Sequence, residues 1–482
     1  MESTGLPIAP SLVAPGNGVT RGGRGVAVWS TLQQAFGLLF VLTLIWGVLS
    51  FPYFKRMLVG YVPVAVGLGL ACLASRRSVA AGVERFLAAW PQRRFLIVVV
   101  SLAVVLRVVA VLLLAEEPVS DHDVYHRTAL RMLGGRGYGP TAYFAPGMSF
   151  WLLLVYWSFG ESLLAAWLVN AGIGGVLTWL TYDVGRRVVA EPAARLAAVL
   201  AAVFPSLVLY ATTLGNDPLL GCAIFTAVTL FLRRPPARAH PAWYVALIGV
   251  VLGAVTFLKP IGLLLPVVFG LCYWRRGATL TRSFRNGAVL AVVLFVTILP
   301  WSIRNVLVFG EYVAVTTGGG AALWMTNHAD ATALSEKPPD FPPGTSEVQH
   351  DRILWKRSWE HILRHPDRFI RMLLPKAAYL WGTSSTVVST ASADRWDPNV
   401  ERAAKFVINV AWTFVCVLFV VAIWRDALCR STVAFWPVVC LLAYLWGIHL
   451  FYEAQSRYHL AFLPVLFIGA AAAMLRRRPV DV

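Results

Sequence analysis

The sequence predicts an all-α polytopic membrane protein, and two observations support this fold class. Of the 482 residues, 58% are hydrophobic and only 14% are charged, with a mean hydropathy of +0.67. Soluble domains are about 45–50% apolar and carry about 25% charged residues. The apolar residues also form long runs, and about 20 such residues cross the ~30 Å hydrocarbon core as a helix. A soluble enzyme, a disordered chain and a protein with a single anchor are therefore excluded.

We predict twelve membrane spans with both termini in the cytoplasm. They cover residues 30–51, 57–74, 95–115, 163–184, 195–214, 218–232, 241–258, 261–274, 284–303, 403–424, 432–450 and 458–475. The apolar segment 146–160 is short and is assigned to the membrane interface. A span there would place Arg186, Arg187 and Arg195 outside, whereas basic residues favour the cytoplasmic side.

The net charge of +18 fits this topology. Its basic residues form short groups between apolar runs, as in cytoplasmic loops that face anionic lipid, so we expect membrane lipid and no nucleic acid as a partner. The six cysteines lie in apolar runs or beside arginine and lack metal-binding spacing, which argues against a disulfide framework.

The spans and loops divide the chain into five parts. These are a disordered cytoplasmic tail at 1–27, two extra N-terminal helices at 28–94, a core at 95–303 that includes a first outer loop at 116–162, a large outer loop at 304–402, and C-terminal helices at 403–482. The tail lacks the apolar region of a signal peptide. The large loop contains an amphipathic stretch at 351–381, and loops of this length are commonly functional. We therefore assign it to acceptor recognition or gating.

The first candidate site is SDHDVYHRTALRMLGG at 120–135, for which two interpretations stay open. In the structural one, Ser120 caps a helix, Asp123 closes a capping box and Gly134 ends the helix. In the functional one, Asp121 is a general base at the outer face, where low-dielectric lipid raises its basicity.

A second carboxylate occurs in a short outward turn, at Asn216-Asp217-Pro218. This tripeptide is also an ordinary turn or helix start. Two outward carboxylates from separate loops would be suited to bind and deprotonate one acceptor.

Three basic residues lie at the same membrane level: Lys259, Arg304 and Arg457. Each alone is typical of a snorkelling anchor. Together, on the side where positive charge is disfavoured, they suggest a phosphate clamp. Arg107 lies inside a predicted span and is expected to face the interior of the bundle. No histidine spacing indicates a metal site.

These residues belong to a longer pattern that resembles family-39-type glycosyltransferases of the GT-C superfamily, which include protein O-mannosyltransferases and the lipid A aminoarabinose transferase. The matching residues are Asp121-x-x-x-Tyr125, Gly137-Tyr138, Tyr143-Phe144-Ala145-Pro146-Gly147, Phe159-Gly160, Asn216-Asp217-Pro218, Lys259, Pro300-Trp301, Arg304-Asn305 and Arg457-Tyr458. They follow in order over residues 95–475. The resemblance implies a GT-C fold with about twelve transmembrane helices and outward-facing juxtamembrane helices.

The resemblance also implies a polyprenyl-phosphate-linked sugar as donor and transfer on the extracytoplasmic face. Asp121 and Asp217 match the catalytic acids. Lys259, Arg304 and Arg457 fall where such enzymes place basic residues near the lipid phosphate, with less weight on the last two. Further support is expected from Asp123, Tyr125, Tyr143, Tyr458 and His459, and the role of Asp123 is open. The aminoarabinose transferases carry a Glu-Lys pair where this chain has Ala145-Pro146, which cannot ligate a metal. No metal or other cofactor is therefore assigned.

The sequence thus predicts an inverting glycosyltransferase of the bacterial inner membrane, with its active site on the extracytoplasmic side and a lipid, glycan or protein as acceptor. A transporter or flippase of lipid-linked solutes is an alternative, but it predicts charges near the middle of the membrane and paired broken helices. An O-antigen-ligase-like enzyme is another, and a structural scaffold is the weakest. If the main prediction is right, Asp121, Asp217 and Lys259 line one cavity that opens to the outer leaflet.

Overall fold

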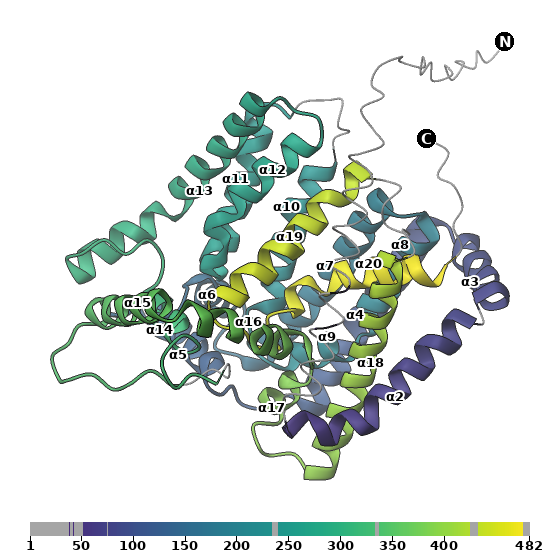
Figure 1. Ribbon diagram of the computed structural model, residues 1–482, viewed down its shortest axis with the longest axis horizontal. Helices are drawn as coiled ribbons and strands as arrows, with labels where there is room; N and C mark the ends of the chain where they lie inside the picture. Colours follow the sequence, from purple (N-terminus) through teal and green to yellow (C-terminus); the bar gives the residue numbers. More distant parts are fainter. Residues whose placement is uncertain are drawn as a thin grey trace.

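A computed structural model describes residues 52–74, 76–233, 240–332, 337–424 and 432–475, together with Leu38 and Leu42. Over these residues the secondary structure is helical, without a strand (Figure 1). The predicted tail at 1–27, and the predicted span at 30–51 apart from the two leucines, lie outside the described residues.

Helices occupy the positions of the other eleven predicted spans. They are α2 (Pro52–Ala74), α4 (Gln92–Leu114), α7 (Leu163–Val188), α8 (Glu191–Val203) with α9 (Pro205–Leu209) and η1 (Tyr210–Thr212), α10 (Asp217–Leu232), α11 (Ala242–Leu258), η2 (Pro260–Leu264) with α12 (Leu265–Arg275), α13 (Leu280–Phe309), α18 (Pro398–Trp424), α19 (Thr432–Phe451), and η3 (Leu460–Phe462) with α20 (Leu463–Met474). Helices α4, α7, α13 and α18 are individually long and apolar enough to cross a membrane. The predicted class, an all-α polytopic membrane protein, is confirmed.

Two helices depart from the predicted boundaries. Helix α3 (Arg76–Ala89) follows α2 and was not predicted, since its sequence is amphipathic and lies between two apolar runs. Helix α13 extends to Phe309, past the predicted end at residue 303. Arg304 therefore belongs to the last turns of a helix and does not follow it.

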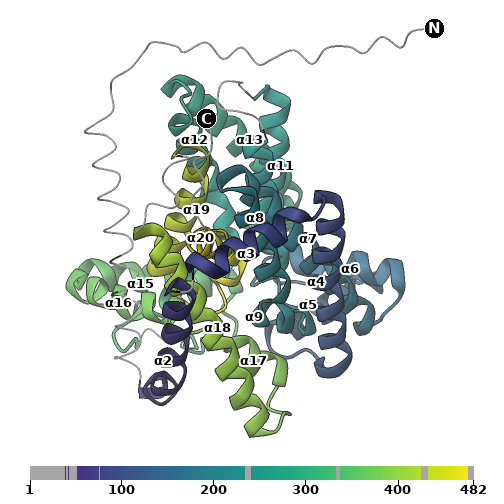
Figure 2. The ribbon, with the colours of Figure 1, turned by 90° about the vertical axis from the view of Figure 1, so that its right-hand side faces the viewer.

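The shorter helices gather below the long helices α11, α13 and α19 in Figure 1. They are α5 (Asp121–Leu133), α6 (Gly147–Phe159), α14 (Gly319–Trp324), α15 (Glu347–Arg364), α16 (Pro366–Trp381) and α17 (Thr386–Ser392). The side view in Figure 2 shows α15 and α16 on one side of the bundle and α5 and α6 on the other. The first and the large predicted outer loops therefore supply helices at the same end of the molecule.

A bend between α8 and α9 is stabilised by a buried arginine. The two helices meet at Phe204 at an angle of 47°, because Pro205 cannot continue the hydrogen-bonding of α8. Arg107 of α4 is only 1% exposed, and its guanidinium donates to the carbonyls of Ala201 (3.0 Å) and Ala202 (3.0 Å). These carbonyls lie in the last turn of α8, where helical partners are missing. As predicted, Arg107 faces the interior of the bundle.

Candidate active site

Asp121 is the first residue of α5, in a position that a capping box does not explain. Ser120 has φ 55° and ψ −131°, and its side chain makes no capping hydrogen bond. Asp123 instead accepts from Arg127 Nε at 2.8 Å, one helical turn further on. The helix begins and ends where the structural interpretation places it, with Gly134 as C-cap, but the predicted capping box is wrong.

The carboxylate of Asp121 forms an ion pair with Arg457, which lies in the segment between α19 and η3. Arg457 Nη1 donates to Asp121 Oδ2 at 2.8 Å, and His122 Nε2 lies 3.8 Å from Oδ1. Burial raises the pKa of Asp121, but the charge of Arg457 and the hydrogen bond from it outweigh this effect, so the pKa is lower than usual. Asp121 is therefore ionised at neutral pH.

Asp217 is the first residue of α10 and is 2% exposed. Its carboxylate accepts a hydrogen bond from the hydroxyl of Tyr210. The ring of Tyr210 lies directly against the backbone of Gly215, where a Cβ would overlap it, so this turn requires glycine. Asn216 donates to the carbonyl of Leu258 at 2.9 Å and fastens the turn to the end of α11.

Lys259 follows Leu258 and completes the cluster. Its ammonium lies 3.3 Å from the centroid of the Tyr458 ring, a cation–π contact. Burial, with a smaller contribution from Arg457, lowers the pKa of Lys259 to about 8, although Asp217, Glu453 and Asp121 act in the opposite direction. The geometry agrees: the guanidinium of Arg457 lies 5.7 Å from the centroid of the same Tyr458 ring, and Asn216, next to Asp217, bonds to Leu258, next to Lys259.

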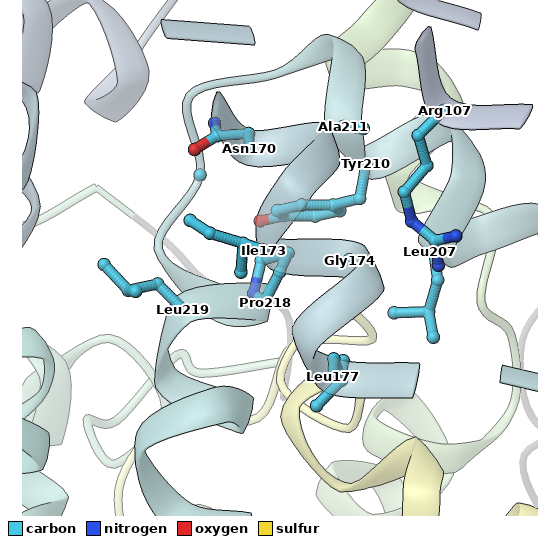
Figure 3. Close-up of a pocket in the computed structure, with 11 residues that line it drawn as sticks. Arg107, Asn170, Ile173, Gly174, Leu177, Leu207, Tyr210, Ala211, Pro218 and Leu219 are labelled. Atoms are coloured by element: carbon cyan, nitrogen blue, oxygen red, sulfur yellow. The ribbon is translucent and has the colours of Figure 1, made fainter. Parts of the chain in front are cut away.

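A small cavity adjoins Tyr210 (Figure 3). It is lined by Arg107, Asn170, Ile173, Gly174, Leu177, Leu207, Tyr210, Ala211, Gly215, Pro218 and Leu219. Its volume, about 10 Å³, is enough for about one water molecule. The cavity is therefore too small for a sugar phosphate. It surrounds the tyrosine that holds Asp217, but none of Asp121, Asp217 and Lys259 lines it, so it is not the cavity that the sequence predicts around these residues.

Tyr125 and His122 of α5 pack behind the charged residues. Tyr125 is 6% exposed, and its ring packs edge-on against Phe144 at 5.6 Å between centroids. Its hydroxyl lies within the electrostatic range of Asp121, Arg457 and Asp217, and burial raises its pKa above the usual range. His122 is 1% exposed, and burial lowers its pKa, so we expect it to be neutral.

Three candidate residues bond to partners outside the cluster of Asp121, Asp217, Lys259 and Arg457. Arg304 donates to the backbone carbonyls of Gly139 and Thr141, which secures the first predicted outer loop against α13. Asp123 pairs with Arg127 on the surface of α5. The imidazole of His459 stacks on Trp412 at 3.9 Å and contacts the carbonyl of Leu380 at 2.8 Å.

Tyr143 lies where the predicted outer loops 116–162 and 304–402 contact each other. Glu347, which the sequence analysis did not single out, joins the two loops. Glu347, at the start of α15, accepts hydrogen bonds from the Ala142 amide at 2.9 Å and from the Thr317 hydroxyl. The Thr317 amide donates to the Ala142 carbonyl at 3.0 Å. No local pattern predicts this junction, because Glu347 and Ala142 are 205 residues apart in sequence.

Glu453 is a second residue that the sequence interpretation missed. It is 8% exposed, and its carboxylate accepts from the Tyr458 hydroxyl at 2.9 Å. The available signal was its place in the same short polar segment as Arg457. Among the residues that the structure describes, no group of three or more His, Cys, Asp or Glu side chains is arranged to hold a metal ion.

Comparison with solved structures identifies the fold. The apo oligosaccharyltransferase of Archaeoglobus fulgidus matches with a TM-score of 0.50 and 13% identity over 80% of this chain and 51% of its own. The same enzyme with an inhibitory peptide and a dolichol-phosphate has a TM-score of 0.49 and 12% identity, over 79% and 49%. ArnT from Cupriavidus metallidurans bound to undecaprenyl phosphate has a TM-score of 0.41 and 16% identity, over 80% and 77%.

The chain spans about half the length of the archaeal oligosaccharyltransferase. No protein-family model and no curated protein matches the sequence. At 13% identity, the apo oligosaccharyltransferase match shows the fold and not the activity. With the helices described above, it confirms the fold that the sequence motifs suggested: the chain has the GT-C fold.

Proposed function

We propose that this protein is an inverting glycosyltransferase that moves a sugar from a polyprenyl-phosphate donor to an acceptor hydroxyl on the extracytoplasmic face of a bacterial inner membrane. The observation that carries the proposal is that two acids and two cations from four distant segments lie together: Asp121, Asp217, Lys259 and Arg457. The GT-C fold and the likeness to an oligosaccharyltransferase support the same class of reaction.

The two cations are suited to hold the phosphate of the donor. Lys259 contributes an ammonium on an aromatic ring, and Arg457 contributes a guanidinium that is already at hydrogen-bonding distance from Asp121. Negative charge develops on the phosphate oxygen as the sugar leaves. Fixed cations in a partly dry site stabilise that charge more strongly than water does.

Asp121 is the proposed general base. The acceptor oxygen attacks the anomeric carbon as the bond to the phosphate oxygen breaks, and the phosphate leaves with the electron pair. Asp121 takes the proton of the acceptor hydroxyl. Asp217, held by Tyr210, orients the acceptor or shares in the deprotonation. A single displacement of this kind inverts the anomeric configuration.

The Asp121–Arg457 ion pair connects donor binding to basicity. Without donor, Arg457 lowers the pKa of Asp121, which makes it a weaker base. A donor phosphate competes for the guanidinium, and the basicity of Asp121 rises as that contact weakens. The base is thereby strengthened when the donor is in place.

The transporter alternative predicts charges near the middle of the membrane and paired broken helices. Among the described residues the bend between α8 and α9 is a broken span, and Arg107 is a charge inside a predicted span. The hydrogen bonds from Arg107 to the end of α8 give it a structural role. A lipid, a glycan or a protein remains open as acceptor.

The proposal is tested by incubating the purified protein with a panel of polyprenyl-phosphate sugars and acceptors, and by identifying products by mass spectrometry. We expect Asp121→Asn to reduce transfer by about 10²–10⁴-fold, the usual effect of losing a general base. Asp123→Asn is the matched control, since Asp123 is paired with Arg127 outside the cluster, and it should retain activity. Near-normal turnover by Asp121→Asn would contradict the assignment.

A further inference from the structure

The segment between α19 and η3 folds around the carboxylate of Glu453. One carboxylate oxygen accepts from the Tyr458 hydroxyl at 2.9 Å, and the other accepts from the Gln455 amide. The backbone carbonyl of Glu453 lies 3.1 Å from His449 Nδ1. Both oxygens of a largely buried acid are therefore used within one short segment, and this fixes where the Tyr458 ring lies.

The Tyr458 ring in turn contacts the ammonium of Lys259, which belongs to a different part of the chain. The ammonium lies 3.3 Å from the ring centroid, and His449 stacks on the same ring at 4.6 Å. A cation over an aromatic face is attracted by the ring quadrupole, more strongly where water is excluded. A phenol that donates to a carboxylate has a more electron-rich ring, which strengthens this attraction.

The charges around Lys259 come from several elements. Asp121 of α5, Asp217 of α10, and Glu453 and Arg457 of the segment after α19 act on it electrostatically. His449 of α19 also lies within electrostatic range. Asp121 is paired with Arg457 and Asp217 with Tyr210, whereas Glu453 is bonded to the tyrosine that contacts Lys259.

We propose that Glu453 is a positioning residue for Lys259 and acts through the ring of Tyr458. The inference rests on the proposed function in one respect, that Lys259 is a cation for the donor phosphate. Glu453 does not touch the donor in this account. It holds the ring under the ammonium and adds negative charge that keeps Lys259 protonated.

A direct test is the protonation of Lys259, measured without any substrate. Trace acetylation of the full-length protein across a pH series, read by mass spectrometry, reports the neutral fraction of this amine. We expect the labelling midpoint near pH 8 in the wild type. Glu453→Gln should move the midpoint to lower pH because one carboxylate is lost, and Glu453→Asp should restore part of the shift. Equal midpoints in the wild type and Glu453→Gln would overturn the proposal.

Kinetics test whether the effect passes through Tyr458. We expect Glu453→Gln to lower kcat/KM for the donor about tenfold, the order expected for one lost charge-assisted hydrogen bond, with part of the loss in kcat because Lys259 also stabilises the leaving phosphate. In a Tyr458→Phe background the same substitution should have a much smaller effect, since the hydroxyl that connects the two residues is already absent. Full additivity in this double-mutant cycle would contradict positioning through the ring.

Glu360→Gln is the matched control, because Glu360 lies on α15 and pairs only loosely with Lys356, at 3.9 Å. Thermal unfolding of every variant shows whether the fold is kept. If no donor is turned over even by the wild type, the proposed function fails. The labelling midpoints would still decide whether Glu453 controls Lys259, so the two failures are distinguishable.

Discussion

The balance of charge around Lys259 determines over which pH range the site can hold a phosphate. Burial lowers the pKa of this lysine to about 8, so its ammonium is lost as pH rises through that value. Arg457 keeps its charge throughout, since arginine remains protonated in proteins. Phosphate binding should therefore weaken in alkali because of Lys259 and not because of Arg457.

We predict that kcat/KM for the donor falls as pH rises above about 8. This ratio reports the ionisations of the free enzyme, in which Lys259 is without phosphate. In Lys259→Arg the alkaline decline should disappear or move to much higher pH, because a guanidinium does not titrate there. The measurement is a pH series of initial rates for both proteins. The same decline in Lys259→Arg would assign it to another group.

At the scale of elements, the bend between α8 and α9 depends on space for Arg107. Gly174 of α7 provides it, since a Cβ at this position would overlap the guanidinium. Gly172, on the same helix, has open space around its Cβ position. The two glycines therefore form a matched pair.

We predict that Gly174→Ala lowers the midpoint of thermal unfolding by several degrees and that Gly172→Ala leaves it nearly unchanged. The first substitution displaces Arg107 and leaves buried carbonyls of α8 without a partner, at a cost of about 1–3 kcal/mol for each group. Thermal unfolding in detergent or nanodiscs measures both variants. A neutral Gly174→Ala would show that Arg107 has another stable position.

The contact between the two predicted outer loops is a second element-scale feature. Glu347→Ala removes the acceptor for the Ala142 amide and the Thr317 hydroxyl. We predict faster proteolysis within residues 134–146, the segment that joins α5 to α6, and no such change in Glu360→Ala. Time-resolved limited proteolysis with mass spectrometry locates the cuts. Identical rates in the two variants would mean that the other contacts suffice to hold the loops together.

At the scale of the whole molecule, the positions of the spans were predictable because the bilayer demands long apolar segments that satisfy their own hydrogen bonds. The helix that joins α2 to α4 and the length of α13 were not predictable, since they depend on amphipathic or local effects within an apolar background. Asp121 and Arg457 are 336 residues apart in sequence. The sequence predicts that both lie at the same level of the membrane, but their direct contact is known only from the structure.

The roles of individual polar residues were the least predictable part. The sequence predicts that His459 supports the site, and in the structure its ring stacks on Trp381 and Trp412. It predicts that Arg304 lies near the donor phosphate, and in the structure the guanidinium donates to loop carbonyls. Such outcomes depend on which groups approach in three dimensions, and neither residue type nor spacing encodes that.

In the proposed reaction the donor phosphate binds beside Asp121, between Lys259 and Arg457. The most direct measurement is a cryo-EM structure of the protein in a lipid nanodisc with a polyprenyl phosphate. We predict density for the phosphate within about 3 Å of Lys259 Nζ and of the Arg457 guanidinium, with the Asp121 carboxylate facing it. A phosphate bound at the opposite end of the bundle, or one that contacts neither cation, would contradict the account.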